Sequence, residues 1–276
     1  MDALQQFLDS VQTRHESATD PRYRQLVLGL LSHLFAYARE VRLTRKEWLA
    51  GIAFLNSVGR ASQAGRDEFM LLSDVIGFSS LMDLLDQIPG STEGTVLGPF
   101  YQRDSPRRDN GGSLIDQNDG GDRLTVEGTI RSLEGGPIAG AEVDVWSCAS
   151  NGLYPAQDPA QPPNNMRGMV TADDQGRYAF TVVRPTNYSV PTDGPVGDFL
   201  RLCHRPSRRA AHVHMVVSAP GYESVTTHLF DDACPYLKVD AVFSVRQSLI
   251  RHFEPAGEHA WRTHFDIRLA AIPGKF

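Results

Sequence analysis

The 276-residue chain has few cysteines, no long apolar run and no long run of basic residues. Its three cysteines, Cys148, Cys203 and Cys234, form no CxxC pair, which argues against a zinc ribbon or a dithiol redox motif and favours reduced thiols. No apolar stretch reaches the roughly 20 residues that a membrane span needs. The net charge of −6 argues against a nucleic-acid-binding protein.

The N-terminus also lacks the features of a secretory leader. Residues 1–6 carry neither a basic region nor an apolar core, so we expect no signal peptide and a cytoplasmic location. Hydrophobic residues make up 41% of the chain and charged residues 22%, as in ordinary globular proteins. The length allows one large domain or two modest ones.

Up to about residue 90, apolar residues recur at helical spacing. Four helices are predicted: over residues 20–40, from Thr44 onward, over residues 64–76 and over residues 79–87. Asp20 followed by Pro21 predicts a capped helix start, and Thr44 with Glu47 predicts a capping box. Such short amphipathic helices need a second domain or a partner subunit to cover their apolar faces.

After a Gly-, Asp- and Pro-rich connection, the hydrophobic period changes to alternation. Strands are expected over residues 124–130, 141–146, 177–183, 212–218, 225–230 and 263–269. Turn-forming residues separate several of them, which is typical of a β-sandwich. We therefore predict an α+β protein with a helical N-terminal domain (1–90), a linker (91–123) and an antiparallel β-sandwich (124–276).

The most informative feature is a pair of histidines in a strand-like run, His212 and His214. Successive side chains of a strand point to opposite faces, so these two share one face. Their Cα atoms should lie roughly 6–7 Å apart, which lets both imidazoles reach one metal ion. Taken alone, two histidines on one face of a strand are more often structural or solvent-facing than metal ligands.

Two tyrosines lie in Pro-, Gly- and Asn-rich stretches that read as loops, Tyr154 and Tyr188. Either one could simply pack against its neighbouring prolines. Taken with the two histidines, however, they would give a metal two phenolic oxygens and two nitrogens. Phenolates are hard anionic donors that favour ferric iron, whereas zinc more often takes Cys, His and carboxylate. Four protein ligands leave open positions, which suits a chelating aromatic ortho-diol.

Several segments together, in this order and spacing, are specific to one family. They are residues 71–77, 95–101, 152–154, 165–168, 188–197, 211–214 and 226–228. On these segments the chain resembles the intradiol ring-cleavage dioxygenases, and within them most closely the hydroxyquinol 1,2-dioxygenases. The resemblance covers nearly the whole chain and implies that the helical part is a dimerisation domain.

The resemblance implies one Fe(III) per subunit held by Tyr154, Tyr188, His212 and His214. It also implies that Tyr188 takes up a substrate proton and that Arg209 stabilises negative charge developing on the ring. Alternatively, Arg209 could pair with one of the nearby acids. The chain departs from the family pattern at Ala210, where proline is usual, and at His228, where catechol enzymes often have glutamine. A histidine can still donate or accept a hydrogen bond at that position next to the ligands.

The resemblance also assigns a mostly apolar substrate lining, which suits a flat ring. The lining residues are Leu71, Asp74, Val96, Leu97, Gly98, Pro99, Phe100, Val190, Pro191, Arg209 and Val242. Asp74 could accept a hydrogen bond from a third ring hydroxyl, or could be a helix-surface or capping carboxylate. Gly98–Pro99 predicts a tight turn that brings backbone close to the ring, or an ordinary loop corner.

The implied reaction is cleavage of hydroxyquinol (1,2,4-trihydroxybenzene) by O2 between its adjacent hydroxyls, giving 3-hydroxy-cis,cis-muconate and then maleylacetate. The nearest alternative is a catechol or chlorocatechol 1,2-dioxygenase. A distant one is a metal-free β-sandwich binding module. The family also implies a homodimer formed through the N-terminal helices, with a phospholipid at that interface.

Overall fold

The computed structural model describes residues 3–63, 65–117 and 119–274, and the chain divides into two compact units, Met1–Asn56 and Ser57–Phe276. The two units are groups of residues that contact one another more than they contact the rest of the chain. This division does not test the predicted domain boundaries at residues 90 and 123, which stay predictions. None of the helices in the described part of the chain is long and apolar enough to cross a membrane.

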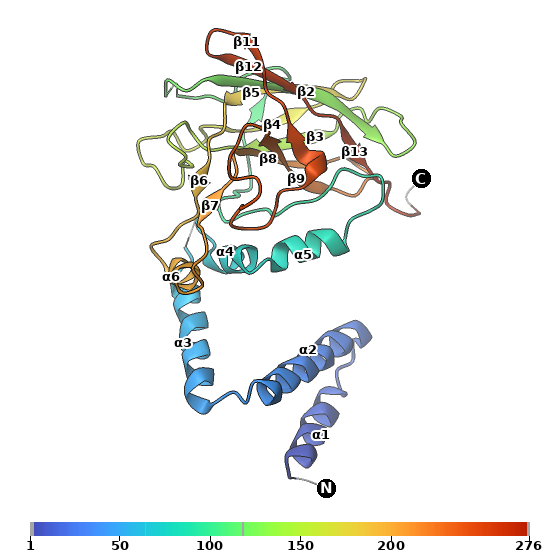
Figure 1. Cartoon of the computed structure of the whole chain (residues 1–276). Helices are drawn as coiled ribbons and strands as arrows, with labels where there is room; N and C mark the ends of the chain where they lie inside the picture. Colours follow the sequence, from blue (N-terminus) through green and yellow to red (C-terminus); the bar gives the residue numbers. More distant parts are fainter. Residues whose placement is uncertain (1–2, 64, 118, 275–276) are drawn as a thin grey trace. The chain divides into compact units, whose positions relative to one another are not determined.

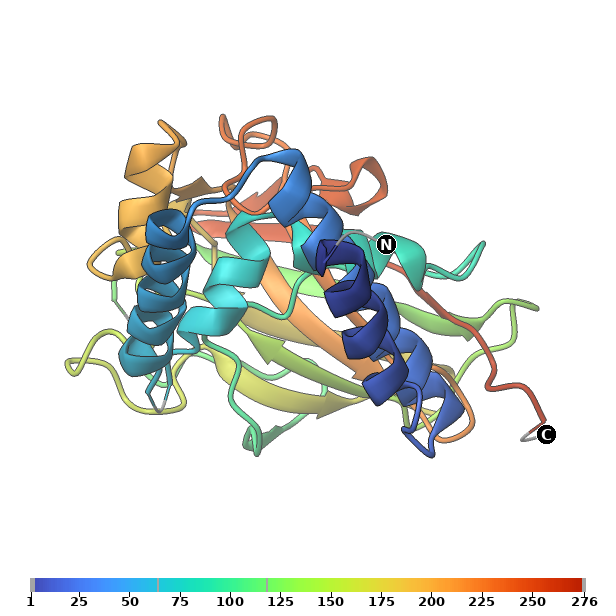
Figure 2. The ribbon, with the colours of Figure 1, turned by 90° about the horizontal axis from the view of Figure 1, so that it is seen from below.

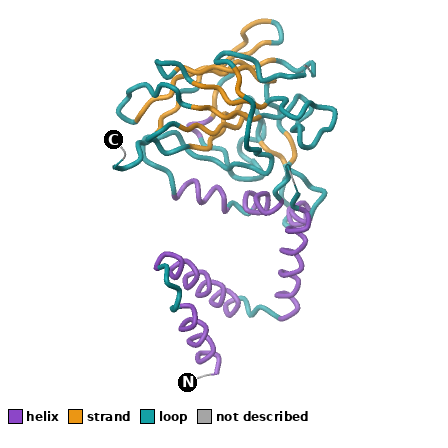
Figure 3. The backbone as a smooth tube through the Cα atoms, turned by 180° about the vertical axis from the view of Figure 1, so that it is seen from behind, coloured by secondary structure: helices purple, strands orange, loops and turns teal. Residues whose placement is uncertain are grey.

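The first unit is helical, as predicted. It consists of α1 (Ala3–His15), α2 (Pro21–Glu40) and most of α3 (Arg45–Ala61), drawn in purple in Figure 3. Helix α2 begins where predicted, because the Asp20 carboxylate accepts the backbone N–H of Tyr23 at 2.9 Å. The capping box is also confirmed: Glu47 accepts the backbone N–H of Thr44 at 2.8 Å. Helix α1 was not predicted, since its few apolar residues are outnumbered by polar ones.

Two short helices of the second unit, α4 (Glu68–Val75) and α5 (Phe78–Leu85), match the third and fourth predicted helices with shorter bounds. Helix α4 begins only after Asp67, whose carboxylate accepts the Met70 backbone N–H at 2.9 Å. Residue 64, where that helix was predicted to begin, lies outside the described residues. Both helices lie along one side of the strands (Figures 1 and 2).

The strands form two larger sheets, visible as two layers in Figure 1. The first sheet has the order β1 (Arg107–Arg108), β4 (Arg167–Thr171), β3 (Glu142–Trp146), β8 (His212–Ser218), β9 (Val225–Asp231) and β10 (Ile250–Arg251). The second has the order β11 (Glu254–Gly257), β12 (Ala260–His264), β2 (Arg123–Ser132) and β13 (Ile267–Leu269), and β5 (Arg177–Val183) pairs with β2. A separate pair joins β6 (Tyr188–Ser189) to β7 (Arg208–Arg209).

The sandwich is mixed rather than antiparallel throughout, which corrects the prediction. Strands β1 and β4, β9 and β10, β12 and β2, and β13 and β2 pair in parallel. Alternation of apolar residues reports which face a residue occupies, and it carries no information on the direction of the neighbouring strand. The overall α+β class and the helical N-terminal part are confirmed.

Two further differences concern single elements. The strand predicted over residues 263–269 is two strands, β12 and β13, which pair with different stretches of β2. Between the two strands the ladder is interrupted: Thr129 donates its backbone N–H to the Asp266 side chain at 2.8 Å. Gly128 of β2 lies against Phe265 at this point, where an added Cβ would sit 2.0 Å from the carbonyl oxygen. Helix α6 (Pro195–Leu202), which was not predicted, follows the β6 segment and begins with a proline, as helices often do.

The core lies between the two sheets and is built from the inward faces of the alternating strands. Strand β2 shows the pattern directly, with every second residue buried along its length. Val143, Val213, Leu229 and Phe180 are among its fully buried members, drawn from both sheets. This packed core fixes β8 and β9, so the side chains that they carry are held on a rigid support.

Candidate active site

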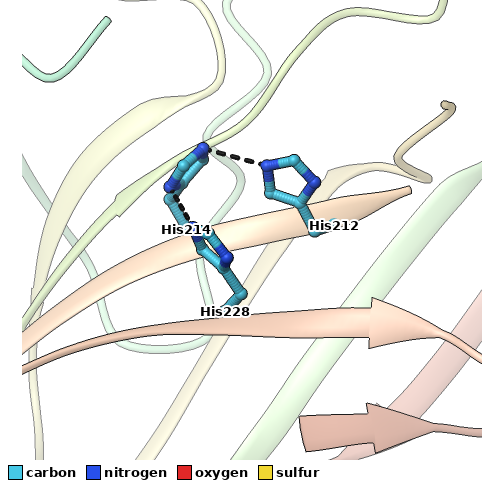
Figure 4. A group of neighbouring side chains, drawn as sticks. All are labelled: His212, His214 and His228. Carbon is cyan, nitrogen blue, oxygen red and sulfur yellow. Dashed lines mark hydrogen bonds between the residues drawn. The ribbon is translucent and has the colours of Figure 1, made fainter. Parts of the chain in front are cut away.

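The two histidines of the His-x-His motif meet inside the sandwich. His212 and His214 lie on β8, point to the same side as predicted, and are 0% and 2% exposed. Their Nε2 atoms are 3.0 Å apart. In Figure 4 dashed lines join the ring of His214 to that of His212 and to that of His228, which comes from the adjacent strand β9. The three ring centroids lie 4.2–4.6 Å from one another. Three buried imidazoles therefore form one cluster that could hold a metal ion.

The two predicted tyrosines reach the same place from other parts of the chain. Tyr154 lies in the loop after β3, and Tyr188 lies in β6, a two-residue strand rather than the predicted loop. Both are buried, and their hydroxyl oxygens are 3.2 Å apart. The Tyr188 hydroxyl lies 3.4 Å from His212 Nε2. The structure thus brings together all four residues predicted to bind the metal.

The hydrogen bond that Nδ1 of His212 makes determines whether its Nε2 atom carries a proton. His212 Nδ1 lies 2.6 Å from the Ala210 carbonyl oxygen, so it must carry a proton and donate it. Burial lowers the pKa of His212 to about 3 and that of His214 well below its usual value, so both rings are neutral near pH 7. Neutral His212 therefore presents an unprotonated Nε2 to the cluster.

The donor set fits a Lewis-acidic metal ion. Burial, with the neighbouring Tyr188, raises the pKa of Tyr154 well above its usual value, and burial also raises the pKa of Tyr188. Two phenols that resist ionisation and buried imidazole lone pairs are costly to desolvate without a cation. A bound metal ion would offset this cost of desolvation, because it stabilises phenolates and accepts the nitrogen lone pairs.

Arg209 lies beside this cluster on β7, where it is paired in register with Tyr188. The guanidinium is buried, and its Nε donates to Asp240 at 3.3 Å while Nη2 donates to the Ser244 hydroxyl at 2.7 Å. Burial alone would lower the pKa of Arg209, but the charges of Asp240 and the nearby phenols raise it above its usual value. The ion pair considered from the sequence is therefore present, and the catalytic role of Arg209 stays a prediction.

A cavity of about 460 Å³ opens at this side of the sandwich. Three predicted lining residues, Phe100, Val190 and Pro191, contribute to its wall, together with Leu153, the neighbour of Tyr154. The Phe100 ring stacks on Tyr154 with ring centroids 4.9 Å apart. The rest of the lining is mostly polar and includes Gln63, Arg66, Gln157, Thr192 and Asp193.

The other predicted lining residues are distributed around the cluster. Leu97 packs against the buried group that contains both tyrosines. Gly98 has a φ of +79°, and a Cβ there would lie 3.3 Å from His214 Cε1, so the predicted turn does bring backbone onto the site. Leu71, Val96 and Val242 are buried, Pro99 is half-buried, and none of them lines the 460 Å³ cavity.

Asp74, in the last turn of α4, is 1% exposed, so it is not a surface carboxylate. It is not a capping carboxylate either, because Asp67 caps the start of α4 and no side chain caps the start of α5. Its Oδ1 has no hydrogen-bond partner among the described residues. Burial raises its pKa to about 7, although hydrogen bonding to Ser79 and the charge of Arg209 act in the opposite direction. Asp74 also lies outside the lining of the 460 Å³ cavity. Its Oδ1 is an unused, buried acceptor, and Arg209 is close enough for its charge to lower the pKa of Asp74.

Sequence reasoning missed two groups that shape the site. Trp146 of β3 stacks on His214, with ring centroids 4.6 Å apart and an interplanar angle of 13°. Its position follows from the register that pairs Trp146 with His214, which no local pattern reveals. Asp240 accepts the Ala210 backbone N–H at 3.1 Å as well as bonding Arg209, so it ties the arginine to the chain leading into β8.

A helical N-terminal part, a β-sandwich and a buried site of two histidines and two tyrosines define the class of protein. The family model for "Dioxygenase" matches residues 96–271, and the model for "Catechol dioxygenase N terminus" matches residues 20–90. The chain belongs to the intradiol ring-cleavage dioxygenase family, as its motifs predicted.

Individual relatives agree with this assignment. The chain is 38% identical to the catechol 1,2-dioxygenase of Candida albicans, over 96% of this chain and 92% of that protein. It is also 38% identical to the hydroxyquinol 1,2-dioxygenase of Nocardioides simplex, over 96% of this chain and 95% of that protein. The solved structure of hydroxyquinol 1,2-dioxygenase from Pseudomonas putida DLL-E4 superposes with a TM-score of 0.84, at 37% identity, over 96% of this chain and 98% of that one.

Proposed function

We propose that the protein cleaves hydroxyquinol with O2 between its two adjacent hydroxyls, giving 3-hydroxy-cis,cis-muconate, which tautomerises to maleylacetate. The observation that carries the choice of substrate is the buried, unpartnered Oδ1 of Asp74. A buried acceptor favours a ring that brings a third hydroxyl and disfavours one that leaves it unpaired. Similarity to several hydroxyquinol 1,2-dioxygenases supports the same choice.

The proposal includes one Fe(III) per subunit, held by Tyr154, Tyr188, His212 and His214. The contacts of 3.0–3.4 Å that link these four polar atoms support this ligand set. When bound, ferric iron supplies the Lewis acidity that lets a diol lose its protons near neutral pH. Two neutral imidazoles and two phenolates would leave one positive charge on the centre, and two once Tyr188 is protonated, which would match the two negative charges of a fully ionised diol.

The side chains around the metal have separate tasks in this proposal. Tyr188 takes up a proton of the diol on its hydroxyl oxygen as the substrate binds. Arg209 is fixed by Asp240 and Ser244, so its charge is already in place when negative charge develops on the ring. Phe100 and Val190 give the ring apolar walls that exclude water.

The second candidate is a catechol or chlorocatechol 1,2-dioxygenase. The equal identity to a catechol 1,2-dioxygenase favours it, as does the apolar character of the other proposed lining residues. The metal-free binding module is wrong as an alternative, because the chain belongs to a family of dioxygenases.

We further propose that two copies of the chain pair through their N-terminal helices. Tyr23, Leu26, Leu30, Leu34 and Tyr37 recur every three or four residues along α2, and each is more than half exposed. A second helix of the same kind would cover such a stripe. We place the predicted phospholipid along the same helices, where α1 and α2 enclose a cavity of about 240 Å³ that includes Leu8, Leu28, Leu31 and Phe35.

The test compares kcat/KM for hydroxyquinol and catechol and identifies the products by mass spectrometry under 18O2. We expect hydroxyquinol to be preferred and both oxygen atoms to enter the product. The Asp74→Ala variant should lose most of that preference while it keeps activity on catechol. A wild-type preference for catechol, or an unchanged ratio in Asp74→Ala, would contradict the choice of substrate.

A further inference from the structure

His214 can bind a metal in only one of its two neutral forms, and the role of its neighbour His228 described below rests on the proposed function. A neutral imidazole has one proton, on either Nδ1 or Nε2. His214 Nε2 faces the cluster, 3.0 Å from His212 Nε2. For His214 to offer a lone pair there, its single proton must be on Nδ1, on the other side of the ring.

His228 is placed to enforce this arrangement. It is 0% exposed, and it lies directly opposite His214 in the register of β8 and β9. Its Nε2 is 2.6 Å from His214 Nδ1, a short hydrogen bond that Figure 4 shows as a dashed line. Because His214 must donate from Nδ1, His228 must accept through an unprotonated Nε2.

We propose that His228 is a positioning residue, which accepts the Nδ1 proton of His214 and so keeps His214 Nε2 free for the metal. The two histidines predicted as ligands, His212 and His214, then differ in the group that accepts their Nδ1 proton. The partner of His212 is the Ala210 carbonyl, a backbone group that no substitution removes. The partner of His214 is a side chain, so the strength of the metal site depends on the residue at position 228.

The proton of His228 itself is thereby assigned to Nδ1. This atom is buried and has no hydrogen-bond partner among the described residues, and the backbone of Val96 lies close enough to His228 to affect its pKa. Val96 begins the stretch 96–100 that is proposed to line the substrate site. Just before it, Thr95 donates its N–H to the Thr226 carbonyl at 2.8 Å, two residues from His228.

Three variants of the full chain separate this role from packing. His228→Gln keeps an acceptor, the amide oxygen, whereas His228→Leu removes it. Phe230→Leu is the matched control, because Phe230 is also 0% exposed, lies two residues along the same strand and contacts His212 without hydrogen bonding it. The readout is the dissociation constant for Fe(III), from competition with a chelator, with circular dichroism as the folding check.

We expect His228→Leu to weaken Fe(III) binding by about 10- to 100-fold, while His228→Gln and Phe230→Leu stay within about threefold of the wild type. Equal affinity in His228→Leu and the wild type would overturn the proposal, as would an equal loss in His228→Gln and His228→Leu. A wild-type protein that binds no Fe(III) would instead overturn the proposed function. The two failures are therefore distinguishable.

A second measurement needs no variant and decides the matter even if His228→Leu does not fold. Loading the wild type with Ga(III), a diamagnetic substitute for ferric iron, allows 15N NMR of the histidine rings. We expect His212, His214 and His228 all to carry their proton on Nδ1. A proton on Nε2 of His228 would mean that His228 donates to His214, and that would overturn the proposal.

Discussion

The helical unit and the sandwich unit differ in where they put apolar and polar side chains. No residue of α1 or α2 is buried, and leucines such as Leu30 and Leu34 are 60% and 51% exposed. In the sandwich, by contrast, the ionisable side chains of Arg209, His212 and Asp240 are buried. Burying these polar groups costs the sandwich free energy of desolvation. The helices instead leave apolar side chains exposed, and these form the surface of the proposed dimer contact.

The largest expected effect is on the buried polar groups. His212→Ala removes a proposed ligand together with its hydrogen bond to the Ala210 carbonyl. Loss of a residue that only hydrogen-bonds a ligand can cost roughly 100-fold, so we expect the visible colour and the activity to fall further than that. Iron content and turnover measure this. The control His264→Ala, which removes a 60% exposed histidine, should behave like the wild type. Retention of iron by His212→Ala would contradict the assigned ligand set.

The second effect is on the helical unit alone. Replacing Leu30 and Leu34 together by glutamate puts charge into the apolar stripe of α2. We expect sedimentation to show monomers, with the iron content and colour of the sandwich kept. Gln25→Glu with His33→Glu adds the same two carboxylates at other exposed positions of α2 and should leave the dimer intact. If the Leu30→Glu, Leu34→Glu variant still forms dimers, the interface does not lie on this face of α2.

A smaller, pH-dependent effect is expected at Asp74. Burial raises its pKa from 3.8 to about 7. A carboxyl group with a raised pKa in the folded state contributes stability that is fully present below its unfolded pKa and is lost as the pH rises through about 7. Asp74→Asn avoids the buried charge, so it should gain stability relative to the wild type between pH 4 and 8, on the order of a few kcal/mol.

Chemical denaturation at several pH values measures this gain. Asp86→Asn, at a solvent-exposed position just after α5, is the matched control: it keeps Asp74, so its stability should follow that of the wild type at every pH. If Asp74→Asn follows the wild type at every pH, the carboxyl group is not buried in the way described.

The smallest effect is expected at the start of α3. Thr44→Ala removes the hydroxyl that accepts the Glu47 backbone N–H at 3.3 Å, which should cost the helical unit about 1 kcal/mol. Thermal unfolding followed by circular dichroism measures it, and Thr44→Ser, which keeps the hydroxyl, should recover most of the loss. Iron binding in the sandwich should not change, and a loss of iron in Thr44→Ala would mean that the units are not independent.

Sequence patterns predicted what depends on local physics. Helix starts at Asp20 and Thr44 follow from side chains that cap the backbone, and alternation placed His212 and His214 on one face. Each of these features depends on residues only a few positions apart, so it can be predicted from the sequence of a single segment. The motif order then predicted the family, which the comparisons confirmed.

The rest depends on which strands become neighbours. Parallel pairing of β12 and β13 with β2, the stacking of Trp146 on His214, and the Arg209–Asp240 ion pair each join segments far apart in the chain. The short strand that holds Tyr188 exists only because β7 lies beside it. None of these contacts leaves a periodic signal in either segment.

The most direct test of the account is the visible absorption spectrum of the purified protein, with its iron content, before and after anaerobic addition of hydroxyquinol. The account predicts one iron per subunit and a broad tyrosinate-to-iron charge-transfer band that shifts when the diol binds. A colourless protein that holds no iron even after reconstitution would contradict it.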